Sequence, residues 1–148
     1  MNPVGAVVAG LVGTAVFTMI LALAPRMGMP KMDIVGLLST MFGKENRLLG
    51  WMMHLMMGVI FALIYAFLWS KGVLAPNWLG GLAFGAVHWL IVGMIMGMMP
   101  IMHAGIRSGR VMTPGLWMTK GGGMLAFFGG LMGHMIFGVV VALVYSAF

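Results

Sequence analysis

Three histidines lie in apolar segments of this sequence, and they are the side chains best suited to chemistry. His54 and His134 occupy equivalent places in two similar segments, and His88 lies in a third segment. An imidazole in hydrocarbon is costly unless it has a partner, so each is expected to face the interior of a helix bundle. Neutral imidazole nitrogens bind haem iron and other metal ions. The sequence therefore predicts a cofactor-binding site formed by His54, His134 and His88.

A b-type haem is the cofactor that the pair His54 and His134 would suit. Histidines from two facing helices at matched depth can supply both axial ligands to one iron. Gly58 and Gly138, one turn along, would leave room for a flat macrocycle, and His88 is a spare ligand. The alternative is that each imidazole only hydrogen-bonds to a neighbouring carbonyl or hydroxyl group and is a packing residue.

The metal, if one is bound, is left open by the sequence. Twenty methionines suggest copper, because thioethers are soft ligands that suit Cu(I). Methionine is also a flexible apolar filler, however, and here it is spread through every span and loop. The only carboxylates, Asp33 and Glu45, share one polar loop, and no nucleotide-binding glycine loop or Ser-His-Asp set is present. An enzymatic activity is therefore not favoured.

Membrane spans are the elements that must position these histidines. The chain is 62% hydrophobic and 7% charged, whereas a soluble domain carries about 25% charged residues. A helix needs about 20 apolar residues to cross a bilayer. The uncharged runs predict four spans in a single transmembrane domain over residues 1–148, at about 4–24, 48–69, 78–101 and 125–147.

The second and fourth spans are copies of each other. Residues 50–65, GWMMHLMMGVIFALIY, match residues 130–145, GLMGHMIFGVVVALVY, at eight of sixteen positions with an offset of 80. The first and third spans agree more weakly at an offset of 75, which pairs Gly10 with Gly85. We therefore predict two parallel two-helix repeats, 1–75 and 76–148, related by an axis along the membrane normal. The predicted fold is an all-α integral membrane four-helix bundle.

Small residues at helical spacing predict the packing faces of these helices. Gly and Ala four residues apart allow helix backbones to approach closely in lipid. The residues assigned to helix packing are Gly58, Ala62, Gly138, Ala142, Gly10, Gly85, Gly93 and Gly97.

Lysine and arginine predict the orientation of the chain. Seven of the eight lie in the loop between the first two spans or in the loop between the last two. Short cationic loops stay in the cytoplasm, so both termini are predicted outside. The net charge of +6 then serves contact with anionic headgroups of the lipid bilayer, and no nucleic-acid partner is expected. His103, at the cytoplasmic end of the third span, is expected to be solvated.

The segments LGWMMHLMMGVIFALIY and GHMIFGVVVALVY resemble those of a family of small four-span bacterial membrane proteins of unknown function. Its members similarly pair a Gly-Trp-x-x-His helix with a later His-x-x-x-Gly…Tyr helix. The resemblance covers nearly the whole chain and implies the bacterial inner membrane. It supplies no activity.

Three functions are compatible with these features. A structural or accessory subunit of a larger membrane complex, or a homo-oligomer, is favoured by the glycine-rich faces and by the absence of catalytic groups. One alternative is a haem- or metal-binding membrane protein that uses His54 and His134. The other is an oligomeric transporter or channel for small solutes, with its path between the repeats.

Overall fold

The structure is a computed structural model that describes all 148 residues, and every regular element in it is helical. Four long helices are apolar enough to cross a membrane, which confirms the predicted fold class. They are α1 (Pro3–Leu23), α3 (Arg47–Ser70), α4 (Trp78–Gly97) and α7 (Thr119–Tyr145). The short elements are η1 (Ala24–Met27), α2 (Ile34–Ser39), α5 (Met99–Met102), α6 (Ala104–Arg107) and η2 (Leu116–Met118).

Asparagine side chains fix where three of the long helices begin. The Oδ1 atoms of Asn2, Asn46 and Asn77 each accept a hydrogen bond from the backbone N–H three residues later, at 3.0, 3.1 and 2.9 Å. These bonds satisfy donors that a helix start otherwise leaves unpaired. The predicted third span, 78–101, is instead divided, because α4 ends at Gly97 and Pro100 lies in the first turn of α5.

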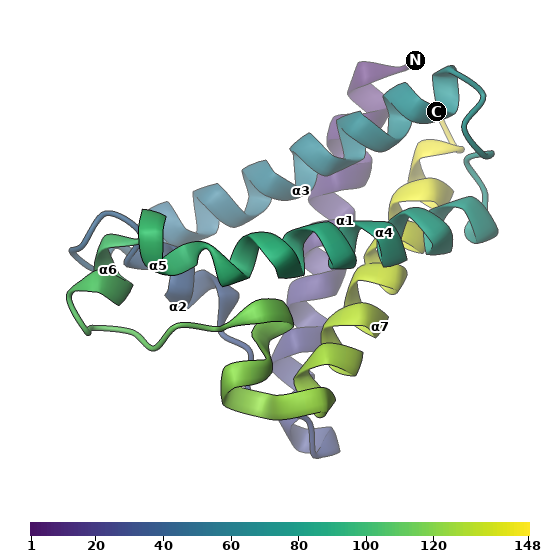
Figure 1. Cartoon of the computed structure of the whole chain (residues 1–148). Helices are drawn as coiled ribbons and strands as arrows, with labels where there is room; N and C mark the ends of the chain where they lie inside the picture. Colours follow the sequence, from purple (N-terminus) through teal and green to yellow (C-terminus); the bar gives the residue numbers. More distant parts are fainter.

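The four long helices converge at one end of the molecule and diverge towards the other. Both termini and the connection between α3 and α4 lie at the convergent end (Figure 1). Away from it, α3 and α4 extend to one side and α1 and α7 to another. Helix α7 packs against α1 and α4, and α1 also packs against α3. The short elements and their connections lie at the divergent end.

Glycines bring the helices of each repeat into backbone contact at equivalent places. In the first repeat, a Cβ atom on Gly10 would lie 2.8 Å from the carbonyl oxygen of Gly58. In the second repeat, a Cβ on Gly85 would lie 2.7 Å from Cα of Met135, and one on Gly138 would collide with the Gly81 carbonyl. The α1–α3 and α4–α7 seams are thus two versions of one close helix contact.

Gly93 and Gly97 have a different neighbour from the other packing glycines. A side chain at either position would meet Trp117 or Leu116 of η2, rather than another spanning helix. The indole Nε1 of Trp117 donates a 3.2 Å hydrogen bond to the Leu90 carbonyl, which fixes the turn on α4. Trp117 and Met118 have φ angles of 47° and 58°, which are left-handed conformations that cost an ordinary residue roughly 1–2 kcal/mol. The contact of η2 with α4 therefore holds a strained turn.

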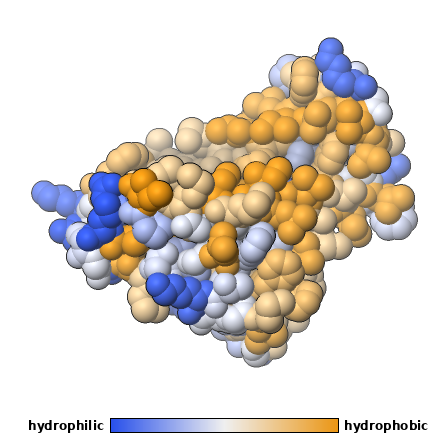
Figure 2. Space-filling view, in the orientation of Figure 1, coloured by the Kyte–Doolittle hydropathy of each residue, from blue (hydrophilic) through white to orange (hydrophobic).

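The outer surface matches a membrane environment. Large apolar side chains are exposed along all four long helices, among them Leu11, Ile60, Leu90 and Leu143. Hydrophobic surface covers the middle of the molecule, and hydrophilic residues gather mainly beside α2 and α6 (Figure 2). Exposed apolar area of this extent is incompatible with a water-soluble monomer.

Candidate functional site

A partly open cavity of about 60 Å³ lies among the four long helices. All three intramembrane histidines line it: His54 from α3, His88 from α4 and His134 from α7. Each of them is less than 10% exposed. The structure thus brings the three predicted site residues into the lining of one cavity, which also includes apolar side chains such as Phe17 and Trp89.

His54 is held by a hydroxyl group of the neighbouring helix. Its Nε2 lies 3.0 Å from Oγ1 of Thr18. That hydroxyl already donates its proton to the carbonyl oxygen of Thr14, at 2.7 Å, so it must accept from His54. His54 is therefore the tautomer protonated on Nε2, and its Nδ1 lone pair has no hydrogen-bond partner in the protein.

His88 is held by the phenol of Tyr65. The Tyr65 hydroxyl lies 2.9 Å from His88 Nδ1 and donates to the Phe84 carbonyl at 3.2 Å. Nδ1 of His88 is thus paired with the phenol, and Nε2 of the same ring has no hydrogen-bond partner in the protein. Phe61 stacks on the imidazole at a centroid distance of 3.6 Å. Hydrogen bond and stacking together fix the orientation of this ring.

His134 is oriented by its own helix and lies directly against His88. Its Nδ1 donates a 2.8 Å hydrogen bond to the carbonyl oxygen of Gly130, so its Nε2 carries a free lone pair. The His134 and His88 rings meet edge to face, with centroids 4.8 Å apart and an interplanar angle of 85°. The Trp89 ring also contacts the His134 imidazole, at a centroid distance of 4.9 Å. Two neutral imidazoles thus touch within the membrane span.

The two repeats differ at this site, although their helices correspond. At the offset of 75, Thr18 of the first repeat corresponds to Gly93 of the second, and Gly13 corresponds to His88. His54 therefore has a hydroxyl partner that His134 lacks, and the second repeat has an additional imidazole. Gly13 packs against Phe137 and Val141, so no ring could stand there. His88, which lies beside His134, therefore has no counterpart in the first repeat.

The dimensions of the cavity favour a ligand of a few atoms over a tetrapyrrole. About 60 Å³ is space for only a few water molecules. The Phe17 ring also contacts both histidines of the haem hypothesis, with centroids 6.1 Å from His54 and 4.8 Å from His134. A macrocycle between those two rings would have to displace Phe17 and much of the surrounding core.

Thioethers supplement the imidazoles around the cavity. No three His, Asp or Glu side chains cluster as a metal site. Four methionines nevertheless belong to the cavity wall: Met32, Met57, Met96 and Met118. Met94, Met98 and Met102, which are spaced four residues apart from α4 into α5, are all exposed and do not face the cavity. Sequence spacing gave no signal for the four that line the site, because two of them come from connecting segments.

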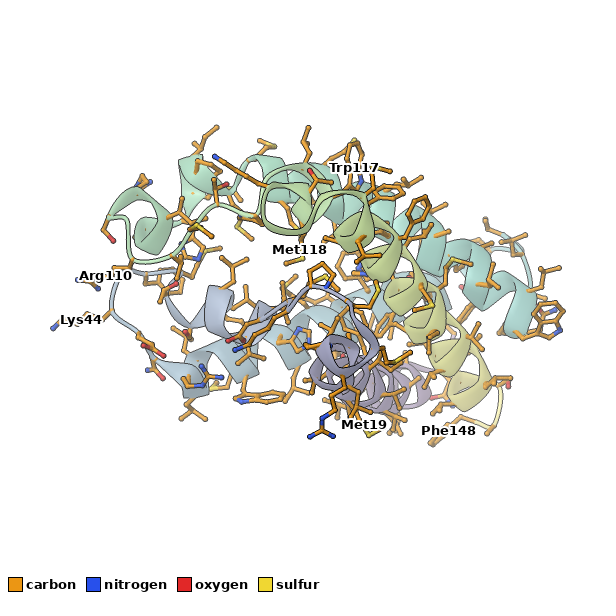
Figure 3. All side chains as sticks on the ribbon, turned by 90° about the horizontal axis from the view of Figure 1, so that it is seen from below. Met19, Lys44, Arg110, Trp117, Met118 and Phe148 are labelled. Atoms are coloured by element: carbon orange, nitrogen blue, oxygen red, sulfur yellow. The ribbon has the colours of Figure 1, made fainter.

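A polar groove of about 800 Å³ adjoins the cavity at the divergent end. Met32 and Met118 line both spaces, so they form the boundary between them. Seen from below, Met118 lies near the centre of the molecule, and Lys44 and Arg110 lie together at one end (Figure 3). The groove contains both carboxylates of the chain, Asp33 and Glu45, at 4.0 and 3.9 Å from Arg47.

The convergent end of the bundle is closed by aromatic side chains. Trp69 stacks on Phe84 at a centroid distance of 5.6 Å and contacts Tyr145 at 5.4 Å. The Tyr145 hydroxyl accepts a 3.0 Å hydrogen bond from the backbone N–H of Asn2. Tyr65 packs against the same layer and is 4% exposed. This aromatic layer lies at the opposite end of the bundle from the groove that adjoins the histidine cavity.

His103 is buried, so the prediction that it is solvated was wrong. It is 0% exposed, and its Nε2 donates to the Leu37 carbonyl at 2.8 Å. Its Nδ1 accepts from the backbone N–H of Ile106 at 3.1 Å and caps α6. Backbone bonds from Ala104 to Met41, at 3.0 Å, join the same two loops. His103 lies inside a contact between loops, which spacing along the chain does not reveal.

Fold and surface define the class: this chain is an all-helical, multi-pass membrane protein. No protein-family model, curated protein or solved structure matches it.

Proposed function

We propose that this chain is a bacterial inner-membrane protein that binds a small ligand inside the bilayer, at His54, His88 and His134. One observation carries the proposal. Each of the three imidazoles uses one nitrogen in a hydrogen bond to the protein and leaves the other nitrogen unpartnered, and all three line one cavity. Unpaired polar atoms in hydrocarbon are costly, which marks intramembrane histidines as functional groups.

The groove supplies the route of entry in this proposal. It adjoins the cavity through Met32 and Met118, which are flexible side chains that can change rotamer to admit a ligand. The aromatic layer of Trp69, Phe84 and Tyr145 lies on the opposite side. Access from one side supports a binding site over the conduit that the repeats also suggested.

The groove faces the cytoplasm in the proposed orientation, with both termini outside. Its cations, Lys31, Arg47 and Arg110, belong to the two loops that hold seven of the eight lysines and arginines. We also propose that the chain belongs to the family of small four-span bacterial membrane proteins that its sequence resembles. An inner-membrane location agrees with that membership.

Single cysteines test both the route and the orientation, because the native chain has no cysteine. Met57→Cys places a thiol in the cavity wall, and Lys44→Cys places one on a cationic loop. Both are expected to react with a small water-soluble thiosulfonate reagent added from the cytoplasmic side of membrane vesicles. The reaction requires the thiolate, which forms only where water reaches the sulfur.

Met56→Cys is the matched control, because it is the adjacent residue of α3 and its side chain is 55% exposed on the apolar surface. It is expected to react at least about tenfold more slowly than Met57→Cys, since lipid keeps its thiol protonated. Equal rates at the two positions would reject the accessible cavity. Labelling of Lys44→Cys from the periplasmic side alone would reverse the orientation.

The accessory-subunit hypothesis has one observation in its favour. An apolar groove between α4 and α7, lined by residues including Leu82, Met132 and Val139, opens on the outer surface. A helix of a second copy, in a homo-oligomer or within a larger complex, would fill it. In the Val139→Trp variant, the indole would occupy the groove and exclude the partner helix. We therefore expect the variant, purified in mild detergent, to elute as a monomer where the native protein elutes as a larger species.

Val87→Trp provides the matched control for this substitution. Val87 is on α4 and 52% exposed but outside the groove, so the variant is expected to elute as the native protein does. A native protein that elutes as a monomer, with no co-purifying subunit, would reject the accessory hypothesis.

A further inference from the structure

We propose that the ligand of this cavity is a soft monovalent metal ion, Cu(I) or Ag(I), bound by the Nε2 atoms of His88 and His134 with a methionine sulfur beside them. The inference rests on the proposed function, since it names the ligand class of the same intramembrane cavity. Four features of the site support it: the free lone pairs, the charge, the methionines and the divergence of the repeats.

The lone pairs are prepared for a metal rather than for the protein. Gly130 accepts from Nδ1 of His134, so Nε2 of that ring is unprotonated, and Nδ1 of His88 is paired with the Tyr65 hydroxyl, so Nε2 of that ring has no protein partner. A hydrogen bond from the remote nitrogen to an oxygen is the usual outer-shell arrangement of a metal-binding histidine, because it fixes the tautomer and the ring orientation. With ring centroids 4.8 Å apart, the two imidazoles are direct neighbours in the cavity wall.

The charge of the site selects a monovalent ion. No acidic side chain lines the histidine cavity, and the two carboxylates of the chain lie with Arg47 in the outer groove. A divalent cation in a buried neutral site would keep two uncompensated charges, which is strongly unfavourable. A monovalent ion that prefers neutral imidazole and thioether ligands carries the smallest such penalty.

Methionine side chains line the histidine cavity and its border with the groove. Met32 and Met118 border both spaces, and Met57 and Met96 complete the thioether wall. Thioethers select Cu(I) over hard cations such as Mg²⁺ and Ca²⁺. Met118 is held towards the centre by the η2 turn (Figure 3), whose Trp117 bonds to α4. It is therefore the methionine that we assign to transfer the ion from the groove to the histidines.

Divergence of the repeats provides internal controls for this site. His54 is the repeat equivalent of His134, but the two rings pair opposite nitrogens: Nε2 of His54 with Thr18, and Nδ1 of His134 with Gly130. Tyr145 is the repeat equivalent of Tyr65, but its hydroxyl bonds to Asn2 rather than to a histidine. The proposal therefore predicts that equivalent substitutions in the two repeats have unequal effects on metal binding.

The experiment titrates the full-length protein in lipid nanodiscs with Ag(I), and with Cu(I) held by a chromogenic chelator that competes for the ion. We expect one equivalent of either ion per chain. His88→Gln and His134→Gln are each expected to weaken binding by at least about 100-fold, the upper range seen when outer-shell partners alone are lost. Tyr65→Phe, which removes only the positioning hydroxyl, is expected to weaken it by about 10-fold.

Matched variants distinguish the loss of a metal-binding residue from the loss of any methionine and from a folding defect. Tyr145→Phe is expected to retain affinity within about threefold of the native protein, well below the effect of a lost outer-shell partner. Met118→Leu conserves volume and is expected to weaken binding, whereas Met19→Leu, at a lipid-facing position 57% exposed, leaves it unchanged. A histidine variant that fails to elute as a folded species cannot test the metal site. In that case two comparisons of affinity test it: Met118→Leu against Met19→Leu, and Tyr65→Phe against Tyr145→Phe.

X-ray absorption of the copper-loaded protein gives an independent readout. Nitrogen and sulfur in the first coordination shell, with sulfur lost in Met118→Leu, would support the assignment. Loss of all metal to the chelator, or equal affinities across the matched pairs, would overturn it. If Met57→Cys reacts but no metal binds, the proposal of an accessible ligand-binding cavity stands and the metal proposal is rejected. The two proposals can therefore be distinguished.

Discussion

Replacing Gly85 by leucine is expected to abolish the native packing of the second repeat. A Cβ atom at this position would lie 2.7 Å from Cα of Met135 and would also collide with the His134 carbonyl. Both obstacles belong to the α7 backbone, so no side chain can rotate away to make room. Overpacking typically costs 1–3 kcal/mol and occasionally more, and we expect about 3 kcal/mol or more here. The measurement is the free energy of unfolding from an SDS titration in mixed micelles.

Gly121→Leu is the control for this prediction. Gly121 is a helical glycine of α7 with nothing within 4 Å of the position that a Cβ would occupy. Leucine there removes the flexibility of glycine from the unfolded chain and meets no obstacle, so stability should not fall. A Gly85→Leu variant as stable as Gly121→Leu would show that α4 and α7 do not meet at this seam.

Replacing His103 by leucine is expected to cost about 2–3 kcal/mol of stability, the range for a buried polar group left without its partner. The substitution removes the bond from Nε2 to the Leu37 carbonyl and leaves the backbone N–H of Ile106 without an acceptor. The site is 0% exposed, so water cannot replace either bond. Thermal denaturation of the purified protein measures the effect.

His103→Asn should recover part of the lost stability. Asparagine is a good helix N-cap, so it can accept from the Ile106 N–H, although it is too short to replace the imidazole at Leu37. The expected order of stability is native, then His103→Asn, then His103→Leu. Equal losses in both variants would mean that the cap on α6 contributes nothing and that the shape of the ring alone matters.

Hydropathy and the repeat predicted most of the architecture from the sequence. Backbone groups in hydrocarbon must be paired within helices or a closed barrel. Four uncharged segments of about 20 residues have the length of membrane-spanning helices. The offset that pairs Gly10 with Gly85 also predicted where backbones approach, since both glycines lie in close helix seams. Helix ends were less predictable. Pro100, for example, divides the expected third span.

The sequence by itself determined that His54, His88 and His134 lie in membrane spans and face a bundle interior, because burial in lipid requires polar groups to turn inward. Only the tertiary structure decided which rings meet. Helix rotation and crossing place His88 in contact with His134 and put Phe17 against both His54 and His134. Depth follows from position along the chain, but proximity depends on how helices pack. Met118 joins the site for the same reason, through a turn held on α4 by Trp117.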